Sequence, residues 1–308
     1  MESTSYEPFP HEVIVGNEKL TYAAKLGEGA YGLVYLYQNA TKRVALKIAT
    51  ERAPQGAIYR ESYYLKKLHL AKINHTPAYY GEGIHNGQNY VILEYVEYSI
   101  EEYTQQFGDA EEKRLAIVRI GQQMIEAVKE IHEAGYLHQD IKPDNFRITK
   151  DGLVKILDFG LINEYKPSGR HKSLCRYGFQ GTPYFGSIRS LEGYTLSRRD
   201  DLESIGYMMM FLLYPESVPW KQSNNYKDIL KQKQDSIKTS YLEESKSVSS
   251  NYIIPKTDIK ETQDGSKLQI LIKFVSKAHF LEYEQDPDYA QFTQILQDCE
   301  LSLYFLDI

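Results

Sequence analysis

Apolar and polar positions divide the chain into an early part with strand patterns and a later part with helix patterns. Apolar and polar side chains alternate along Leu20–Thr50, which is also rich in aromatic and β-branched residues. This alternation predicts strands, with a turn at Asn39–Lys42. A second pair of strands is predicted within Pro77–Tyr95, on either side of the turn formers Asn86 and Gly87.

Helical periodicity dominates the remaining sequence. Apolar residues recur every three or four positions in the segments Gln55–His69, Glu111–Ala134, Leu268–Phe280 and Asp288–Phe305. Gly135 follows the second of these and supplies a helix stop. Asp200–Tyr214 is apolar on nearly every side, which predicts a buried central helix. The stretch from Lys238 to Lys267 is polar and serine-rich, so we predict a long surface insertion there.

The order of these elements predicts an α+β chain with two lobes. Strands fill most of the first part and helices fill the rest, with a short connection near Glu94–Tyr98. We expect an N-terminal extension at 1–19 and a smaller lobe at 20–94, built on an antiparallel sheet with one main helix. A larger, mostly helical lobe is expected at 95–308.

Composition narrows the class of protein. The chain has 308 residues, and its 42 acidic and 36 basic residues give a net charge of -6, which argues against a nucleic-acid binder. Cys175 and Cys299 lack the spacing of a disulfide framework or a zinc site, and they fit a reducing compartment. The longest apolar run, Tyr207–Tyr214, is far shorter than the ~20 residues that span a bilayer. Because a signal-peptide pattern is also absent, we expect a soluble intracellular protein.

A glycine-rich segment, "GEGAYG" at Gly27–Gly32, is the first candidate for chemistry. A strand pattern follows it, so the glycines are expected in a hairpin and not before a helix, as a dinucleotide-binding fold would require. Such a hairpin allows backbone N–H groups to approach phosphate oxygens without obstruction by a Cβ. The alternative for this segment alone is a flexible hairpin with no ligand.

Lys47 and Glu61 form the second candidate feature. Lys47 lies in the apolar strand segment "VALKI", and Glu61 lies on the helix face that carries Ile58, Leu65 and Leu68. Charged side chains in apolar surroundings need partners, so we predict that the two form an ion pair and that Lys47 also reaches a phosphate. The alternative is that both side chains reach solvent at the edges of their elements.

The charged segment "HQDIKPDNF" provides the most specific signal. Phosphoryl transfer needs a group that accepts a hydroxyl proton, a cation near the transferred phosphate and an oxygen ligand for Mg²⁺. Asp140, Lys142 and Asn145 supply these three within six residues. "LDFG" follows, and its Asp158 would be a stronger Mg²⁺ ligand, because hard cations prefer carboxylate oxygen. A solvated surface loop is the alternative, but two such clusters after a glycine loop argue against it.

These motifs resemble those of protein kinases, and further motifs resemble the casein kinase 1 family in particular. The loop "HQDIKPDNF" matches that family except at Gln139, where an arginine is usual. "GTPYFGSIRS" is similar to the segment with which the family replaces the Ala-Pro-Glu motif, and "SRRDDLESIGYMMMFLL" to the start of its central helix. "VPW" and "DPDY" also match. The resemblance extends from about Leu20 to Phe305, which implies a single kinase domain at 20–305 with the bilobal kinase fold.

The resemblance implies an ATP-binding site. Its residues would be Leu26, Gly27, Gly29, Gly32, Val34, Ala45, Lys47, Glu61, Leu93, Glu94, Val96 and Asp158. Lys47 would hold the α- and β-phosphates, Leu93 would be the gatekeeper, and Glu94 to Val96 would form the adenine hinge. The catalytic residues would be Asp140, Lys142 and Asn145, and the metal ligands would be Asn145 and Asp158. Structural support would come from Thr182 and from Asp201, which would bind backbone N–H groups of the catalytic loop.

The implied function is an ATP- and Mg²⁺-dependent serine/threonine protein kinase. We expect a monomer that acts on protein substrates in the cytoplasm or nucleus, without binding nucleic acid or membranes. One alternative is a pseudokinase that acts as a scaffold, although Lys47, Asp140, Asn145 and Asp158 are all intact. Another is a small-molecule kinase, against which "SRRDDLESIG" argues.

One departure from the family concerns substrate choice. Casein kinase 1 enzymes favour substrates already phosphorylated three residues before the target, and an arginine two residues after Gly-Thr helps to bind that phosphate. This chain has Tyr184 there, and Asn163 and Glu164 stand where the family often has lysines. We therefore predict a reduced preference for phosphorylated substrates, unless nearby basic residues replace the site. The candidates for this are Lys172, Arg176 and Arg189.

Overall fold

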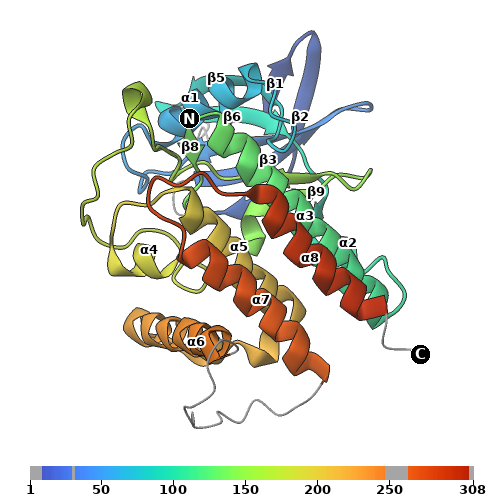
Figure 1. Cartoon of the computed structure of the whole chain (residues 1–308). Coiled ribbons are helices and arrows are strands. Elements are labelled where there is room, and N and C mark those ends of the chain that lie inside the picture. Colours follow the sequence, from blue (N-terminus) through green and yellow to red (C-terminus); the bar gives the residue numbers. More distant parts are fainter. Residues whose placement is uncertain (1–8, 30–31, 247–262, 305–308) are drawn as a thin grey trace. The chain divides into compact units, whose positions relative to one another are not determined.

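The computed structural model describes residues 9–29, 32–246 and 263–304, which fold into two compact units (Figure 1). The first unit comprises Met1–Glu97 and Lys155–Ile162, and the second comprises Tyr98–Val154 and Asn163–Ile308. The strands lie mainly in the first unit and the helices mainly in the second, so the predicted α+β class is confirmed.

The first unit is built on a six-stranded antiparallel sheet with the strand order β1-β2-β3-β4-β6-β5. The strands are β1 (Glu12–Val15), β2 (Glu18–Glu28), β3 (Gly32–Gln38), β4 (Arg43–Ala49), β5 (Tyr79–His85) and β6 (Gln88–Glu94). Strand β1 lies inside the predicted N-terminal extension and pairs with β2. The predicted turn between β5 and β6 is confirmed, and Asn86 and Gly87 both have the positive φ angles that this tight turn requires.

The two faces of this sheet differ in burial because side chains alternate along each strand. One face carries the apolar core of the unit. Its residues are Val13, Val15, Leu20, Tyr35, Tyr37, Val44, Leu46, Ile48 and Ile92. The side chains that point the other way on the central strands, such as Val34, Ala45 and Leu93, are only half-buried. Helix α1 (Ala57–Leu70) packs against β4, β5 and β6 and buries Ile58, Leu65 and Leu68, as the periodicity predicts.

The segment Lys155–Ile162 belongs to the first unit, whereas the sequence places it in the C-terminal lobe. Its hydrogen bonds explain the difference. The backbone N–H of Ile156 donates to the carbonyl of His75 at 2.7 Å, and Lys155 Nζ donates to the carbonyl of Asn74 at 2.6 Å. Such pairings between distant segments leave no periodic signal in the sequence. The division falls within strand β10 (Val154–Ile156). Val154 belongs to the second unit, and Lys155 and Ile156 belong to the first.

The second unit is mainly helical. Its main helices are α2 (Ile100–Thr104), α3 (Ala110–Glu133), α4 (Ile188–Glu192), α5 (Arg198–Leu213), α6 (Tyr226–Lys246), α7 (Gln263–His279) and α8 (Tyr289–Tyr304). Its short strands are β7 (Tyr98–Ser99), β8 (Tyr136–Leu137), β9 (Phe146–Ile148) and β11 (Asn163–Glu164), and its 3-10 turns are η1 (Pro143–Asn145), η2 (Pro167–Gly169), η3 (Pro215–Ser217) and η4 (Pro219–Gln222). As Figure 1 shows, α5 packs against α3 and α7, and α8 packs against the same two helices.

The predicted central helix is confirmed, because nearly every side chain of α5 is buried. The predicted insertion from Lys238 to Lys267 needs correction, since α6 continues to Lys246 and α7 begins at Gln263. Lysines, glutamates and glutamines favour helices even where few apolar residues mark a buried face, and such residues are common in α6. The rest of the predicted insertion, 247–262, lies outside the described residues.

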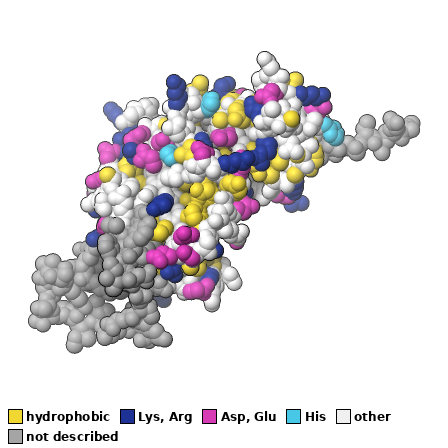
Figure 2. Space-filling model, turned by 90° about the vertical axis from the view of Figure 1, so that its right-hand side faces the viewer, with side chains coloured by type: hydrophobic (Ala, Val, Ile, Leu, Met, Phe, Trp, Pro, Cys, Tyr) yellow, Lys and Arg dark blue, Asp and Glu magenta, His cyan; other side chains and the backbone are white. Residues whose placement is uncertain are grey.

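The surface of the described residues carries charges of both signs. On the face drawn in Figure 2, acidic and basic side chains are interspersed with apolar ones. Every helix within the described ranges is too short or too polar to cross a lipid bilayer.

Candidate active site

The glycine loop joins β2 to β3 in the first unit, and Ala30 and Tyr31 lie outside the described residues. Gly32 must be glycine for a steric reason, because a Cβ there would lie 2.5 Å from the carbonyl oxygen of Ile48. The backbone N–H of Gly29 donates to the carbonyl of Gly32 at 2.9 Å. The space beside Gly27 is open, and a Cβ at Gly29 would lie 3.9 Å from its nearest neighbour, the carbonyl oxygen of Gly32. A ligand can therefore approach this backbone closely.

The half-buried face of the sheet carries several residues of the predicted ATP-binding site. Val34 lies directly opposite Lys47 on the neighbouring strand, and Ala45 lies opposite Leu93, so these four side chains share one face. Leu26 precedes the glycine loop and is 39% exposed. Apolar side chains that remain half-exposed beside a buried lysine are suited to bind a flat, apolar ring.

The first residue of the predicted hinge, Glu94, is bonded to Ala78, the residue directly before β5. The backbone N–H of Glu94 donates to the carbonyl of Ala78 at 2.8 Å. The carboxylate of Glu94 in turn accepts from the backbone N–H of Ala78 at 3.0 Å. Val96 is buried.

Lys47 lies between two carboxylates of the first unit. Its Nζ is 2.7 Å from Glu61 Oε2 and 2.9 Å from Asp158 Oδ1, so the predicted pair with Glu61 is present. The side chains of Lys47 and Glu61 are 11% and 2% exposed, whereas Asp158 is 33% exposed. Burial alone would lower the pKa of Lys47, but the two carboxylates outweigh it and raise the pKa, so the lysine is charged. Burial raises the pKa of Glu61, and Lys47 opposes that shift.

Two adjacent residues of α1 hold the segment that follows Asp158. The carboxylate of Glu61 accepts from the backbone N–H of Phe159 at 3.3 Å. The guanidinium of Arg60 donates to the carbonyl of Ile162 at 2.6 Å and to that of Gly160 at 3.4 Å. Asp158 itself has a φ of 60°, which is unusual for a residue with a side chain. The helix therefore stabilises the backbone directly after the strained residue Asp158, from Phe159 to Ile162. Arg60 was not predicted, because a charged residue on an exposed helix face carries no distinctive pattern.

A second cluster surrounds Asp140 in the second unit. Lys142 Nζ is 2.7 Å from Asp140 Oδ2, and Thr182 Oγ1 donates to Asp140 Oδ1 at 2.9 Å. The side-chain amide of Asn145 donates from Nδ2 to the carbonyl of Asp140 at 2.8 Å and to its Oδ2 at 3.2 Å. The structure thus brings together the three predicted catalytic residues and the predicted supporting residue Thr182.

The backbone of the same loop is held by Asp201 of α5. Its carboxylate accepts from the backbone N–H of His138 at 2.8 Å and from that of Gln139 at 2.9 Å. Gln139 has a φ of 69°, so these two bonds stabilise a strained turn directly before Asp140. His132, which no sequence pattern singles out, places its Nε2 2.9 Å from the same carboxylate. Burial alone would raise the pKa of Asp201, but the bonds from His132 and Gln139 lower it.

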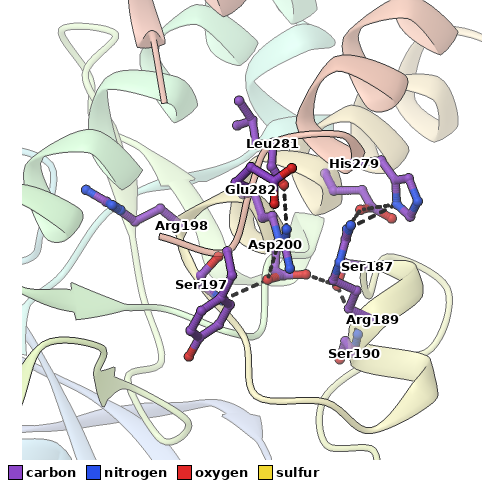
Figure 3. Close-up of polar contacts among 12 residues, drawn as sticks. Ser187, Arg189, Ser190, Ser197, Arg198, Asp200, His279, Leu281 and Glu282 are labelled. Atoms are coloured by element: carbon purple, nitrogen blue, oxygen red, sulfur yellow. Dashed lines mark hydrogen bonds and ion pairs between the residues drawn. The ribbon is translucent and has the colours of Figure 1, made fainter. Parts of the chain in front are cut away.

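Buried acidic residues of α5 also hold helix α4, which begins six residues after Thr182. Asp200 accepts from the hydroxyl of Ser187 and from the backbone N–H of Ser197, both at 2.7 Å (Figure 3). Ser187 is the N-cap of α4, and its oxygen accepts from the backbone N–H of Ser190 at 3.0 Å. Burial and the charge of Glu203 raise the pKa of Asp200 to about 6.

Glu203 makes equivalent contacts one turn further along α5. It accepts from the backbone N–H of Ile188 at 2.7 Å. Its other oxygen lies 3.1 Å from His279 Nδ1 and 3.8 Å from Arg189 Nη1, and Figure 3 shows Arg189 and His279 directed toward one another. Arg189 is therefore occupied by a structural ion pair, although the sequence made it a candidate for binding phosphate.

Comparisons with known proteins agree with this arrangement. A family model described as "Protein kinase domain" matches residues 20–283. Serine/threonine-protein kinase VRK2 of Homo sapiens is 27% identical, over 97% of this chain and 61% of its own length. Casein kinase I homolog 3 of Schizosaccharomyces pombe is 29% identical, over 86% of this chain and 58% of its own. This chain thus spans less than two thirds of either relative. The solved structure of vaccinia related kinase 3 is similar in fold, with a TM-score of 0.74, 20% identity, and coverage of 98% of this chain and 94% of that one.

Proposed function

Because this chain belongs to the protein kinase family, we propose that it is an active serine/threonine protein kinase that transfers the γ-phosphate of ATP to protein hydroxyls. Its relatives include casein kinase I homologues, so the predicted resemblance to that family is confirmed. The arrangement around Asp140 carries the proposal, because a carboxylate with adjacent lysine, asparagine and threonine contacts is suited to phosphoryl transfer.

Asp140 is the proposed catalytic base. Its carboxylate accepts the proton of the substrate hydroxyl while that oxygen forms a bond to the γ-phosphorus, and the bond from phosphorus to the leaving oxygen of ADP breaks. Lys142 is close enough to Asp140 to orient it, and its charge stabilises the negative charge of the transferred group. Lys47, charged and held by Glu61, is the proposed ligand of the α- and β-phosphates.

The donor groups of the two clusters fit Mg²⁺, which prefers oxygen ligands. Asn145 directs its amide nitrogen toward Asp140, which leaves its Oδ1 oriented as an acceptor. The carboxylate side chain of Asp158 is one-third exposed, so a hydrated cation can reach it. Both residues are proposed as Mg²⁺ ligands, and the ion would neutralise charge on the phosphate oxygens.

The test is the Asp140→Asn variant, measured for phosphate transfer to casein and for ATP binding. Loss of a general base costs about 10²–10⁴-fold in turnover, while ATP binding should remain close to that of the wild-type protein. Asp144→Asn is the matched control, because Asp144 is exposed in the same loop. If the wild-type protein binds ATP but transfers no phosphate, the scaffold alternative is correct. Transfer to a small metabolite but not to proteins would favour a small-molecule kinase.

A further inference from the structure

Lys233 of α6 is a fully buried lysine that no step of the proposed chemistry uses. Its side chain is 0% exposed, and its Nζ donates to the carbonyl of Gly186 at 2.7 Å and to that of Pro183 at 3.1 Å. The ammonium group also lies 4.1 Å from the ring centroid of Tyr207 and 5.2 Å from that of Trp220. Two carbonyls and two aromatic faces therefore surround it.

A lysine in this position is costly to the folded protein. Lysines are almost never fully buried without an acidic partner, and none of the ion pairs found among the described residues includes Lys233. The charge of Glu203 acts on Lys233 without an ion pair between them, and Glu203 accepts a hydrogen bond from the hydroxyl of Tyr207 at 3.0 Å. Burial lowers the pKa of Lys233 well below its ordinary value. An apolar residue would fill the same space at lower cost, so the hydrogen bonds themselves suggest a role.

Those hydrogen bonds fix the segment that begins at the catalytic centre. Thr182, which donates to Asp140, is followed directly by Pro183. Lys233 holds the carbonyls of Pro183 and Gly186, and the indole Nε1 of Trp220 donates to the carbonyl between them, that of Tyr184, at 3.0 Å. Three carbonyls of the segment Pro183–Gly186 are thus bound from the protein interior.

The position of this segment indicates what it contacts. Thr182 contacts Asp140 directly, so the chain that continues from Thr182 is the nearest surface in sequence for the residues that flank a hydroxyl presented to Asp140. We infer that Lys233 is a positioning residue that fixes Pro183–Gly186 as the docking surface for the polypeptide substrate. This inference rests on the proposed function. It requires Lys233 to affect the use of polypeptide substrate and to leave ATP binding unchanged.

Kinetics of Lys233→Met provide the main test. Methionine keeps most of the side-chain volume but cannot donate to the two carbonyls. We expect kcat/KM for a peptide substrate to fall at least about tenfold, with the larger change in the peptide KM, and the KM for ATP to stay within about twofold. The matched control is Lys231→Met, the same substitution at an exposed position of α6, which should behave like the wild type.

Trp220 supplies a readout that does not depend on catalysis, because it is the single tryptophan of the chain. Its ring lies beside Lys233 and its indole nitrogen holds Tyr184, so peptide binding should change its fluorescence. This change should weaken or disappear in Lys233→Met and persist in Lys231→Met. A wild-type protein that transfers no phosphate would overturn the proposed function, whereas the fluorescence titration would still test the docking surface.

Two kinetic results would overturn the role of Lys233. If Lys233→Met folds, as judged by circular dichroism, and has the peptide KM of the wild type, Lys233 is not a positioning residue. An equal rise in the KM values for peptide and ATP would also overturn the inference, since it would indicate a general structural defect. If Lys233→Met does not fold, Trp220→Phe decides, because it removes the bond to Tyr184 and keeps an aromatic ring at that position. A raised peptide KM in that variant supports the docking surface, and wild-type kinetics overturn it.

Discussion

Asp200 and Asp201 are adjacent and equally buried on α5, yet their pKa values shift in opposite directions. Burial and the neighbouring Glu203 raise the pKa of Asp200 to about 6 from 3.8. Burial also acts on Asp201, but the hydrogen bonds from His132 and from the backbone N–H of Gln139 lower its pKa. The difference lies in the partners, because Asp200 has a second carboxylate nearby and Asp201 has histidine and backbone donors.

This contrast predicts opposite effects on stability. The folded state disfavours ionised Asp200, so ionisation lowers the free energy of unfolding. This loss of stability is absent below about pH 4, develops between about pH 4 and 6, and is fully present above about pH 6. The shift corresponds to roughly 3 kcal/mol. We expect the stability of Asp200→Asn relative to wild type to rise by an amount of this order between pH 4 and 7, measured by denaturant unfolding.

Asp201→Asn is the internal control. The pKa of Asp201 is lowered, so its contribution is complete above the unfolded value of 3.8 and is lost only as pH falls through the folded value. The variant should therefore be less stable than wild type by a constant amount between pH 5 and 8. A relative stability of Asp200→Asn that does not change with pH would contradict the assignment.

The ion pair between Lys47 and Glu61 predicts that stability and activity can be separated. Lys47→Met leaves Glu61 buried without its partner, which should cost about 3 kcal/mol in the free energy of unfolding. The double variant Lys47→Met, Glu61→Met should recover most of this loss and yet remain inactive. Thermal melts and phosphate transfer measure the two effects. Lys66→Met, at an exposed position of α1, should change neither, and a double variant as unstable as the single one would contradict the prediction.

Gln139 predicts activity without phosphorylation of the activation segment. An arginine before the catalytic aspartate can bind a phosphorylated segment, but a neutral amide cannot form that charged pair. Here Asp201 holds the strained turn at Gln139 through a backbone bond of 2.9 Å. Bacterially produced protein should keep its activity within about twofold after phosphatase treatment. Loss of activity that returns on rephosphorylation would refute this expectation.

Tyr184 predicts a weak preference for phosphate-primed peptides. Its hydroxyl donates to the carbonyl of Lys221, and two candidate replacements are occupied, Arg189 by Glu203 and Arg176 by the carbonyl of Glu192 at 2.7 Å. A phosphate bound by arginine gains roughly 1.5–3 kcal/mol for each hydrogen bond. The ratio of kcat/KM for peptides with phosphoserine or alanine three residues before the target should stay below about a hundredfold. Tyr184→Arg should increase that ratio.

The sequence predicted the parts of this protein that local pattern determines. Strand alternation identified β2 to β6, and helical periodicity identified α1, α3, α5, α7 and α8 to within a few residues. The partner of Lys47 was predictable because Glu61 interrupts an apolar stripe, and an interrupted stripe is visible without a structure.

Contacts that depend on tertiary packing left no such signal. Lys233 lies in a run of polar residues that resembles a solvated helix, and only the fold shows that this position is buried. The bond from Thr182 to Asp140 joins residues 42 apart in the chain, and no spacing rule connects them. Arg60 and His132 were missed for the same reason, since each interacts mainly with groups that come from distant segments.

The three hydrogen bonds that Glu61 and Arg60 make, to the N–H of Phe159 and to the carbonyls of Gly160 and Ile162, have a pharmacological consequence. An inhibitor that binds by expelling Phe159 from its buried position must break the bond to its N–H and pull on the carbonyls of Gly160 and Ile162 as well. Compounds of that type should therefore bind this protein poorly, and those that accept the Asp158–Phe159 backbone as it stands should be preferred. Arg60→Ala should selectively increase affinity for the first class.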